Sequence, residues 1–140
     1  MAVFNKFEVF TEDLAEKVHN FDAAADVLKV MLSNVAPLAT NTVKANLTEI
    51  AAGNGYTAGG TDVQNATSRT GGTTSVTGVD VVWTASGGSI GPFRYVALYN
   101  DTPAAPLDPL IGWWDYGSAL TLAAGESFTV DFGTSLFTVA

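Results

Sequence analysis

The sequence predicts a mainly β protein, either an antiparallel sandwich or a small, jelly-roll-like barrel, with one N-terminal helix. Three observations carry this prediction. Short segments with alternating apolar and polar residues follow one another through the second half of the chain. Turns rich in Gly, Pro, Asn and Asp separate them. A helical apolar pattern occurs at the start of the chain. A length of 140 residues favours a single domain over residues 1–140.

Residues 4–20 carry the helical pattern. Large apolar residues recur there every three or four positions, which places them on one face of a helix. Thr11 is an alternative N-cap and Asn20 a plausible end. The stripe consists of Phe7, Phe10, Leu14, Val18 and Phe21. We expect it to pack against a sheet.

The first strand is expected at 26–33, with alternate residues on opposite faces. The segment 43–51 fits a strand or a short helical turn equally well. The segment 53–75 is rich in Gly, Thr, Ser and Asn, which predicts an extended surface loop or a hairpin with a mobile tip.

Four further strands are expected at 79–84, 95–99, 128–132 and the C-terminal LFTVA. The intervening stretches have turn chemistry, and they include YGSAL at 116–120. We also expect LIGWWDYGS to be extended, because strand alternation then places Trp113 on one face and Trp114 with Tyr116 on the other.

The charge balance argues against several classes of partner. The chain has 14 acidic and 6 basic residues, a net charge of −8, and the basic residues form no cluster. Nucleic acids and anionic membranes both require cationic patches, so neither is expected as a partner. The absence of cysteine excludes disulfides and thiolate chemistry. We find no signal peptide and no apolar run long enough to span a membrane.

No catalytic, cofactor-binding or metal-binding constellation is predicted, so the chain is not expected to be an enzyme. The single histidine, His19, has no indicated nucleophile or second metal ligand, and a surface or helix-capping role is expected. Asp101, Asp108 and Asp115 lie beside the aromatic residues, but turn formation explains them better than glycoside hydrolysis. The glycine clusters lack the lysine of a phosphate-binding loop.

The aromatic residues of 113–116 leave three interpretations open. They belong to the core, to a surface that contacts another subunit, or to a platform that stacks on sugars. Because Trp113 and Trp114 are adjacent in an expected strand, at most one of them faces a single-sided core.

Three stretches resemble a family of small virion proteins of tailed bacteriophages. They are FNKFEVFTEDLAEKVHNF, TEIAAGNGYTAGGT and WTASGGSIGPFRYVALYNDT continuing through PLIGWWDYGSALTLAAGESFTVDF. The resemblance spans nearly the whole chain and implies a capsid decoration (cement) or fibre-type structural protein. It implies the major capsid protein as a partner, a location on the capsid exterior, and assembly in the host cytoplasm.

The resemblance also implies a homo-oligomer, and rotational closure of assemblies favours a trimer. The aromatic N-terminus, residues 1–10, is then a possible capsid-contacting arm. The predicted assembly interface consists of Phe4, Phe7, Phe10, Trp113, Trp114 and Tyr116. The alternative is a phage tail or fibre component, with host-glycan binding through exposed aromatic side chains.

Overall fold

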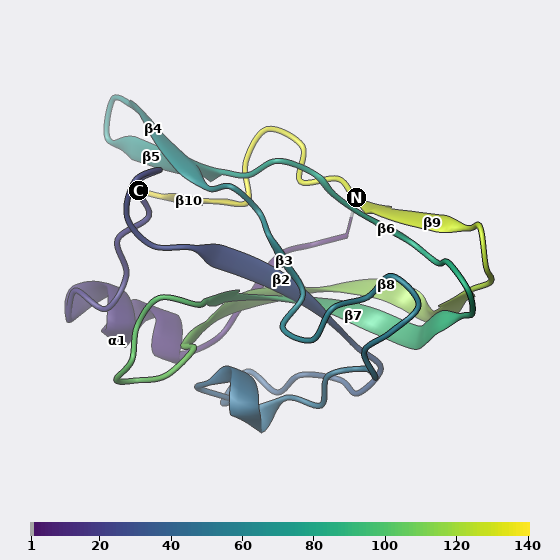
Figure 1. The fold of residues 1–140 in the computed structure, drawn as a ribbon. Helices are drawn as coiled ribbons and strands as arrows, with labels where there is room; N and C mark the ends of the chain where they lie inside the picture. The colour runs from purple at the N-terminus through teal and green to yellow at the C-terminus, as the bar shows by residue number, and fades with distance from the viewer. Residues whose placement is uncertain (1) are drawn as a thin grey trace.

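The computed structural model describes residues 2–140 and shows two layers of antiparallel strands (Figure 1). The lower layer is a five-stranded sheet in the order β1-β8-β7-β2-β3. Its strands are β1 (Asn5–Lys6), β2 (Leu28–Ser33), β3 (Thr61–Asp62), β7 (Ile90–Asn100) and β8 (Leu110–Leu122). The described sheets stay open, so the predicted mainly β class and sandwich arrangement are confirmed, whereas the barrel alternative is not what forms.

The upper layer consists of two ladders of strands, and the chain passes from one ladder to the other. One has the order β10-β5-β4, and the other pairs β6 with β9. The strands are β4 (Ala66–Thr70), β5 (Thr73–Thr77), β6 (Val81–Thr84), β9 (Ser127–Val130) and β10 (Phe137–Val139). Because β6 follows β5 and β10 follows β9 along the chain, the two ladders form one interrupted layer, which runs along the top of Figure 1.

The main core lies between the two layers and follows from strand alternation. On β2, Leu28, Val30 and Leu32 are fully buried on the inner face. The opposing layer contributes the inward side chains of β6, where Val81 and Trp83 are buried. Burying each large apolar side chain stabilises the fold by about 1.5–3 kcal/mol relative to exposure.

The outer face of the five-stranded sheet is also covered. Met31, Tyr99 and Leu110 form a second buried cluster with Phe7 and Ala97. Leu47 packs against this cluster from the segment that contains the 3-10 helix η1 (Lys44–Asn46). The central strands are therefore apolar on both faces, which explains why β2 reads as a nearly continuous hydrophobic run.

The helix is shorter than predicted. It is α1 (Val9–Ala15), a seven-residue helix, instead of residues 4–20. The residues before it form β1, and Lys17 adopts a left-handed conformation with φ 64° after it. Thr11 is not the N-cap, because its hydroxyl donates to the carbonyl of Glu8 within the helix. Tertiary pairing with β8 thus overrides the helical pattern at the N-terminal end.

Three residues of the apolar stripe, Phe7, Phe10 and Phe21, are nevertheless buried, whereas Leu14 and Val18 are half-buried. Phe7 lies beneath Trp113 with ring centroids 4.6 Å apart. Phe10 and Phe21 pack on Phe137 with centroid distances of 5.3 Å in each case. The apolar residues that were expected on one long helix thus lie on a short helix and on the segments before and after it.

The segment 53–75 contains a hairpin, which was one of the two alternatives predicted for it. β4 and β5 pair through Thr70 and Thr73 around a Gly71-Gly72 turn, and the hairpin projects at the upper left of Figure 1. The segment 43–51 contains the helical turn η1, so the strand alternative is wrong there.

The predicted turn at 116–120 is a bulge inside β8. Tyr95 pairs with Asp115, and Phe93 pairs with Leu120, so β7 advances by two residues while β8 advances by five. The extra residues of β8 leave the ladder and expose the Tyr116 side chain. The turn residues therefore mark a real interruption of pairing, although the strand continues through it to Leu122.

Candidate assembly surface and pocket

Residues 4–10 of the N-terminal segment are part of the fold, whereas Ala2 and Val3 before them are exposed. Asn5 and Lys6 pair with Trp113 and Gly112 of β8. The ring of Phe4 lies over Gly112, where a Cβ would overlap it. The same ring packs edge-on against Trp114 at 5.3 Å. This segment closes one side of the sandwich, and residue 1 lies outside the described residues.

The six predicted interface residues separate into two groups. Phe7, Phe10 and Trp114 are 0%, 5% and 6% exposed, so the chain itself already covers them. Phe4 and Trp113 are half-buried, and Tyr116 is 53% exposed. Trp113 and Trp114 do lie on opposite faces of the sheet, as alternation predicted. In this conformation, a partner can reach Tyr116 and the edges of Phe4 and Trp113.

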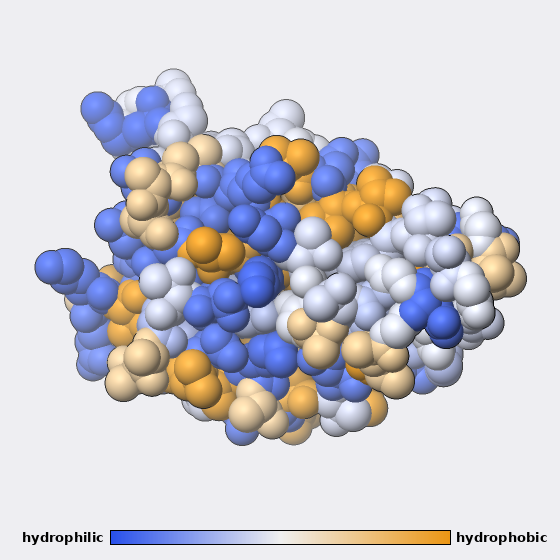
Figure 2. Space-filling view, in the orientation of Figure 1, coloured by the Kyte–Doolittle hydropathy of each residue, from blue (hydrophilic) through white to orange (hydrophobic). Residues whose placement is uncertain are grey.

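Other large apolar side chains are exposed that the sequence interpretation did not select. Figure 2 shows apolar groups interrupting a polar surface in several separate places. Val82 was detectable, because alternation along β6 places it opposite the buried Val81 and Trp83. Nothing in the pattern of the loops marked Leu38 or Leu107. Besides Tyr116, the exposed set is Val3, Val27, Val35, Leu38, Val79, Val82 and Leu107.

A pocket of about 300 Å³ opens on the side of the sandwich between β8 and β9. It forms because β1 pairs with β8 only at Gly112 and Trp113, and because the ladder partner of β9 is β6. On this side of the sandwich, no described strand therefore joins the two layers past Phe4. The lining residues are Ala2, Val96, Trp114, Tyr116, Phe128, Thr129, Val130, Asp131 and Phe132.

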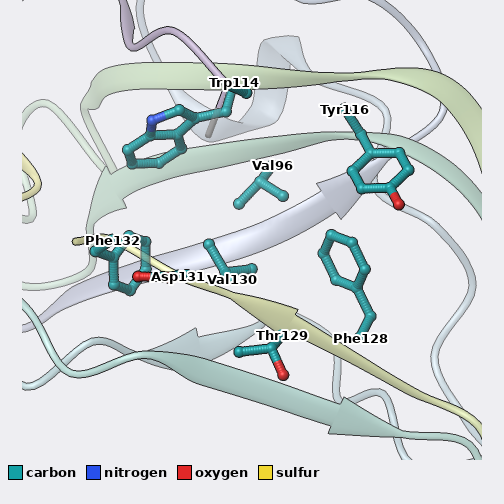
Figure 3. Close-up of a pocket in the computed structure, with 9 residues that line it drawn as sticks. Val96, Trp114, Tyr116, Phe128, Thr129, Val130, Asp131 and Phe132 are labelled. Atoms are coloured by element: carbon teal, nitrogen blue, oxygen red, sulfur yellow. The ribbon is translucent and has the colours of Figure 1, made fainter.

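Figure 3 shows how the lining side chains are arranged. Trp114 and Phe132 lie at one end, with ring centroids 5.7 Å apart. Tyr116 and Phe128 lie at the other end, with centroids 5.3 Å apart in an edge-to-face pair. Two valines lie between these aromatic pairs. The interior is thus apolar and aromatic.

Asp131 is the charged residue that lines this pocket. Its Oδ1 accepts a hydrogen bond of 2.8 Å from the backbone N–H of Gly133. The ion pairs within residues 2–140 join Lys29 to Asp101, Lys44 to Glu49 and Arg94 to Asp115, so Asp131 has no basic partner in this part of the chain. The pocket therefore combines aromatic walls with an exposed aspartate that no cation of residues 2–140 neutralises.

His19 is buried and not on the surface or at a helix end, so the predicted role is wrong. Its Nδ1 accepts a hydrogen bond of 3.0 Å from the Asn100 side chain, which also donates to Asp26 at 2.6 Å. The ring stacks on Phe21 at 5.2 Å. Burial lowers the pKa of His19 to about 4, although the nearby Asp26 carboxylate opposes this shift. A neutral imidazole held by an amide and a phenyl ring serves packing.

Glu49 organises a second network of hydrogen bonds. Tyr56 donates its hydroxyl proton to Glu49 at 2.8 Å and accepts the Leu32 N–H at 3.0 Å. Glu49 also accepts from the Gly59 N–H at 2.6 Å and pairs with Lys44 at 3.2 Å. Burial raises the pKa of Tyr56, which keeps its proton in place as a donor. This network fastens the segment 44–59 to the edge of β2.

Replacing Tyr56 with phenylalanine is expected to lower the free energy of unfolding by about 2 kcal/mol, because the buried Leu32 N–H loses its acceptor. Urea denaturation followed by tryptophan fluorescence measures this change. The control is Tyr116→Phe at a 53% exposed side chain, which should alter stability by less than about 0.5 kcal/mol. Equal stability of wild type and Tyr56→Phe would show that the network does not fasten the segment.

The described residues hold no group of three or more His, Asp or Glu side chains placed to bind a metal ion. No helix in residues 2–140 has the length and apolar character needed to cross a membrane. Comparison with protein-family models, with curated proteins and with solved structures finds no match for this chain.

Proposed function

We propose that this chain is a non-enzymatic structural protein of a tailed-bacteriophage virion. In this proposal it is a decoration protein that binds the outer surface of the major capsid shell and stabilises it. The observation that carries the proposal is the set of exposed large apolar side chains on a folded sandwich, in a chain with only 14% charged residues. Exposed apolar side chains on a stable scaffold provide apolar area that an interface with another protein can bury.

The polar networks of the fold support a binding role. His19 and Glu49 are tied into networks that hold loops to strands, which leaves them unavailable for proton transfer to a substrate. Stability of the scaffold and contact area are what a cementing protein needs. A standard interface buries roughly 1,600 Å² in total, which a surface of 6990 Å² readily supplies.

The proposal includes a homo-oligomer, with a trimer as the expected form. Closed rotational symmetry is the usual outcome for identical chains, and a shell offers seats at three-fold positions. The proposed contacts differ from those first predicted from the sequence. Tyr116 is retained, and Leu38, Leu107 and Val82 replace Phe7, Phe10 and Trp114, because the latter three are covered by the chain itself.

A cryo-EM map of the virion that carries this protein tests the proposal directly. The expected result is density for the sandwich on the outside of the shell at three-fold or quasi-three-fold positions, with Tyr116 or Leu38 against a neighbour. Density confined to the tail or its fibres, with a copy number that matches a tail ring, would replace the capsid assignment with the tail alternative. Absence of the chain from purified virions would overturn both.

A further inference from the structure

The pocket between β8 and β9 has a chemistry that its own chain does not use. Its walls are aromatic at both ends, and Asp131 lines it without a basic partner in residues 2–140 (Figure 3). Tyr116, the most exposed aromatic of the set, stands at one end of it. An aromatic wall beside a carboxylate without an ion-pair partner favours a cation that also has an apolar body.

We propose that this pocket receives an arginine side chain from a partner protein. The three methylenes of arginine fit over Val96 and Val130, while the planar guanidinium stacks on an aromatic face and reaches Asp131. A pocket of about 300 Å³ has room for one large side chain. The inference rests on the proposed function in one respect, which is the assembly in which the partner protein occurs.

The same chain shows this combination of groups once already. The Arg94 guanidinium donates to both carboxylate oxygens of Asp115, at 2.8 and 3.1 Å, and lies 5.4 Å from the ring centroid of Tyr95. These hydrogen bonds lower the pKa of Asp115. The pocket has the same residue types without the arginine: aromatic rings line it, and Asp131 follows directly after β9 beside Phe132.

The charge of the whole chain favours a basic occupant over a neutral one. With a net charge of −8 and three of its six basic side chains already in ion pairs, the surface attracts cationic segments. Arginine suits a partly buried pocket better than lysine does, because the guanidinium is more weakly hydrated and its fork matches a carboxylate.

The test titrates the isolated protein with two blocked tripeptides and follows its amide and indole NMR signals. One probe is acetyl-Gly-Arg-Gly-amide, and the other carries citrulline, which keeps the shape of arginine without its charge. Single side chains are expected to bind in the range of about 10 mM. The arginine probe should shift the Trp114 indole and the amides of 128–132, and these shifts should weaken as salt is added.

Asp131→Asn is expected to raise the Kd of the arginine probe about fivefold, the factor that a partly exposed charge pair supplies. Asparagine retains Oδ1, which accepts from Gly133, so the local turn is kept. The matched control is Glu12→Gln on α1, which changes the net charge equally and should leave the Kd unaltered.

Equal shifts from the citrulline probe would overturn the proposal, because they would show a pocket that selects apolar bulk. Larger shifts from methyl glucoside at the same signals would also overturn it, in favour of a sugar site. No shift from any probe would show that the pocket binds none of these groups. Because every arm uses the isolated protein, these outcomes are independent of where the chain is located in a virion.

Discussion

Lowering the pH from 6.5 to 4 is expected to reduce the free energy of unfolding by about 3 kcal/mol through His19 alone. The side chain is 7% exposed, and its Nδ1 is already an acceptor for the Asn100 amide. A second proton on the imidazole would place a buried positive charge against the N–H donor of the Asn100 amide. The Nε2 atom has no hydrogen-bond partner within residues 2–140, so only the nearby Asp26 carboxylate offsets part of the cost of the buried charge.

The direction of the effect follows from proton binding. In the unfolded chain His19 takes up a proton near its ordinary pKa of 6.5, whereas in the folded chain it does so only near pH 4. Between these values the unfolded state binds more protons, so stability falls by about 1.36 kcal/mol for each unit of acidification. Well above pH 6.5 the imidazole is neutral in both states and contributes no pH dependence.

Urea denaturation at several pH values between neutrality and pH 4 measures the loss. The control is His19→Gln, which cannot titrate and is expected to be less stable at neutral pH but much flatter over this interval. Carboxylates such as Asp13 and Asp115 are present in both proteins, so the difference between the two curves isolates the histidine. Parallel curves would show that His19 is readily protonated in the folded state.

Gly60→Ala is expected to destabilise the fold by about 4 kcal/mol, which is the largest effect we expect from a single methyl group. Gly60 adopts φ 80° and lies directly against β2. A Cβ there would overlap the Val30 carbonyl oxygen and come within 2.9 Å of the Met31 Cα. The left-handed conformation costs about 1–2 kcal/mol for alanine, and displacing packed backbone costs about 1–3 kcal/mol more.

Gly71→Ala provides a matched control, because it separates conformational strain from collision. Gly71 also has positive φ, at 60°, but a Cβ there has nothing within 4 Å. We expect a loss of about 1 kcal/mol from this hairpin tip. Thermal unfolding of both variants measures the difference. Similar melting temperatures would mean that the approach of Gly60 to β2 relaxes without cost.

The strands were predictable because their signal is local. Alternation along 79–84 and 95–99 identifies both faces, and the buried Val81, Trp83, Val96 and Leu98 follow directly from it. The opposite orientations of Trp113 and Trp114 follow from the same period of two. The Gly71-Gly72 turn similarly marks a hairpin without any knowledge of the remaining chain.

The features that were not predicted depend on distant partners. The helical pattern of 4–20 gives way at Asn5 and Lys6 because β8 offers hydrogen bonds to an edge strand. His19 is buried because Asn100, far away in sequence, supplies its hydrogen bond. The pocket arises from a gap between two strands, and no local pattern encodes a gap. Sequence reasoning selected Tyr116 as an interface residue but had no means to place Asp131 beside the same pocket.

The pairing of β1 with β8 has a consequence for synthesis of the chain. The side chain of Asn5 bonds to Trp113, 108 residues later, so the first strand has no partner until most of the chain has been translated. At typical elongation rates this interval lasts roughly 5 to 20 s. During that time Phe4, Phe7 and Phe10 lack the strands and aromatic rings that bury them. Nascent chains are therefore expected to need protection by chaperones, and premature termination before β8 yields a product that cannot close its sandwich.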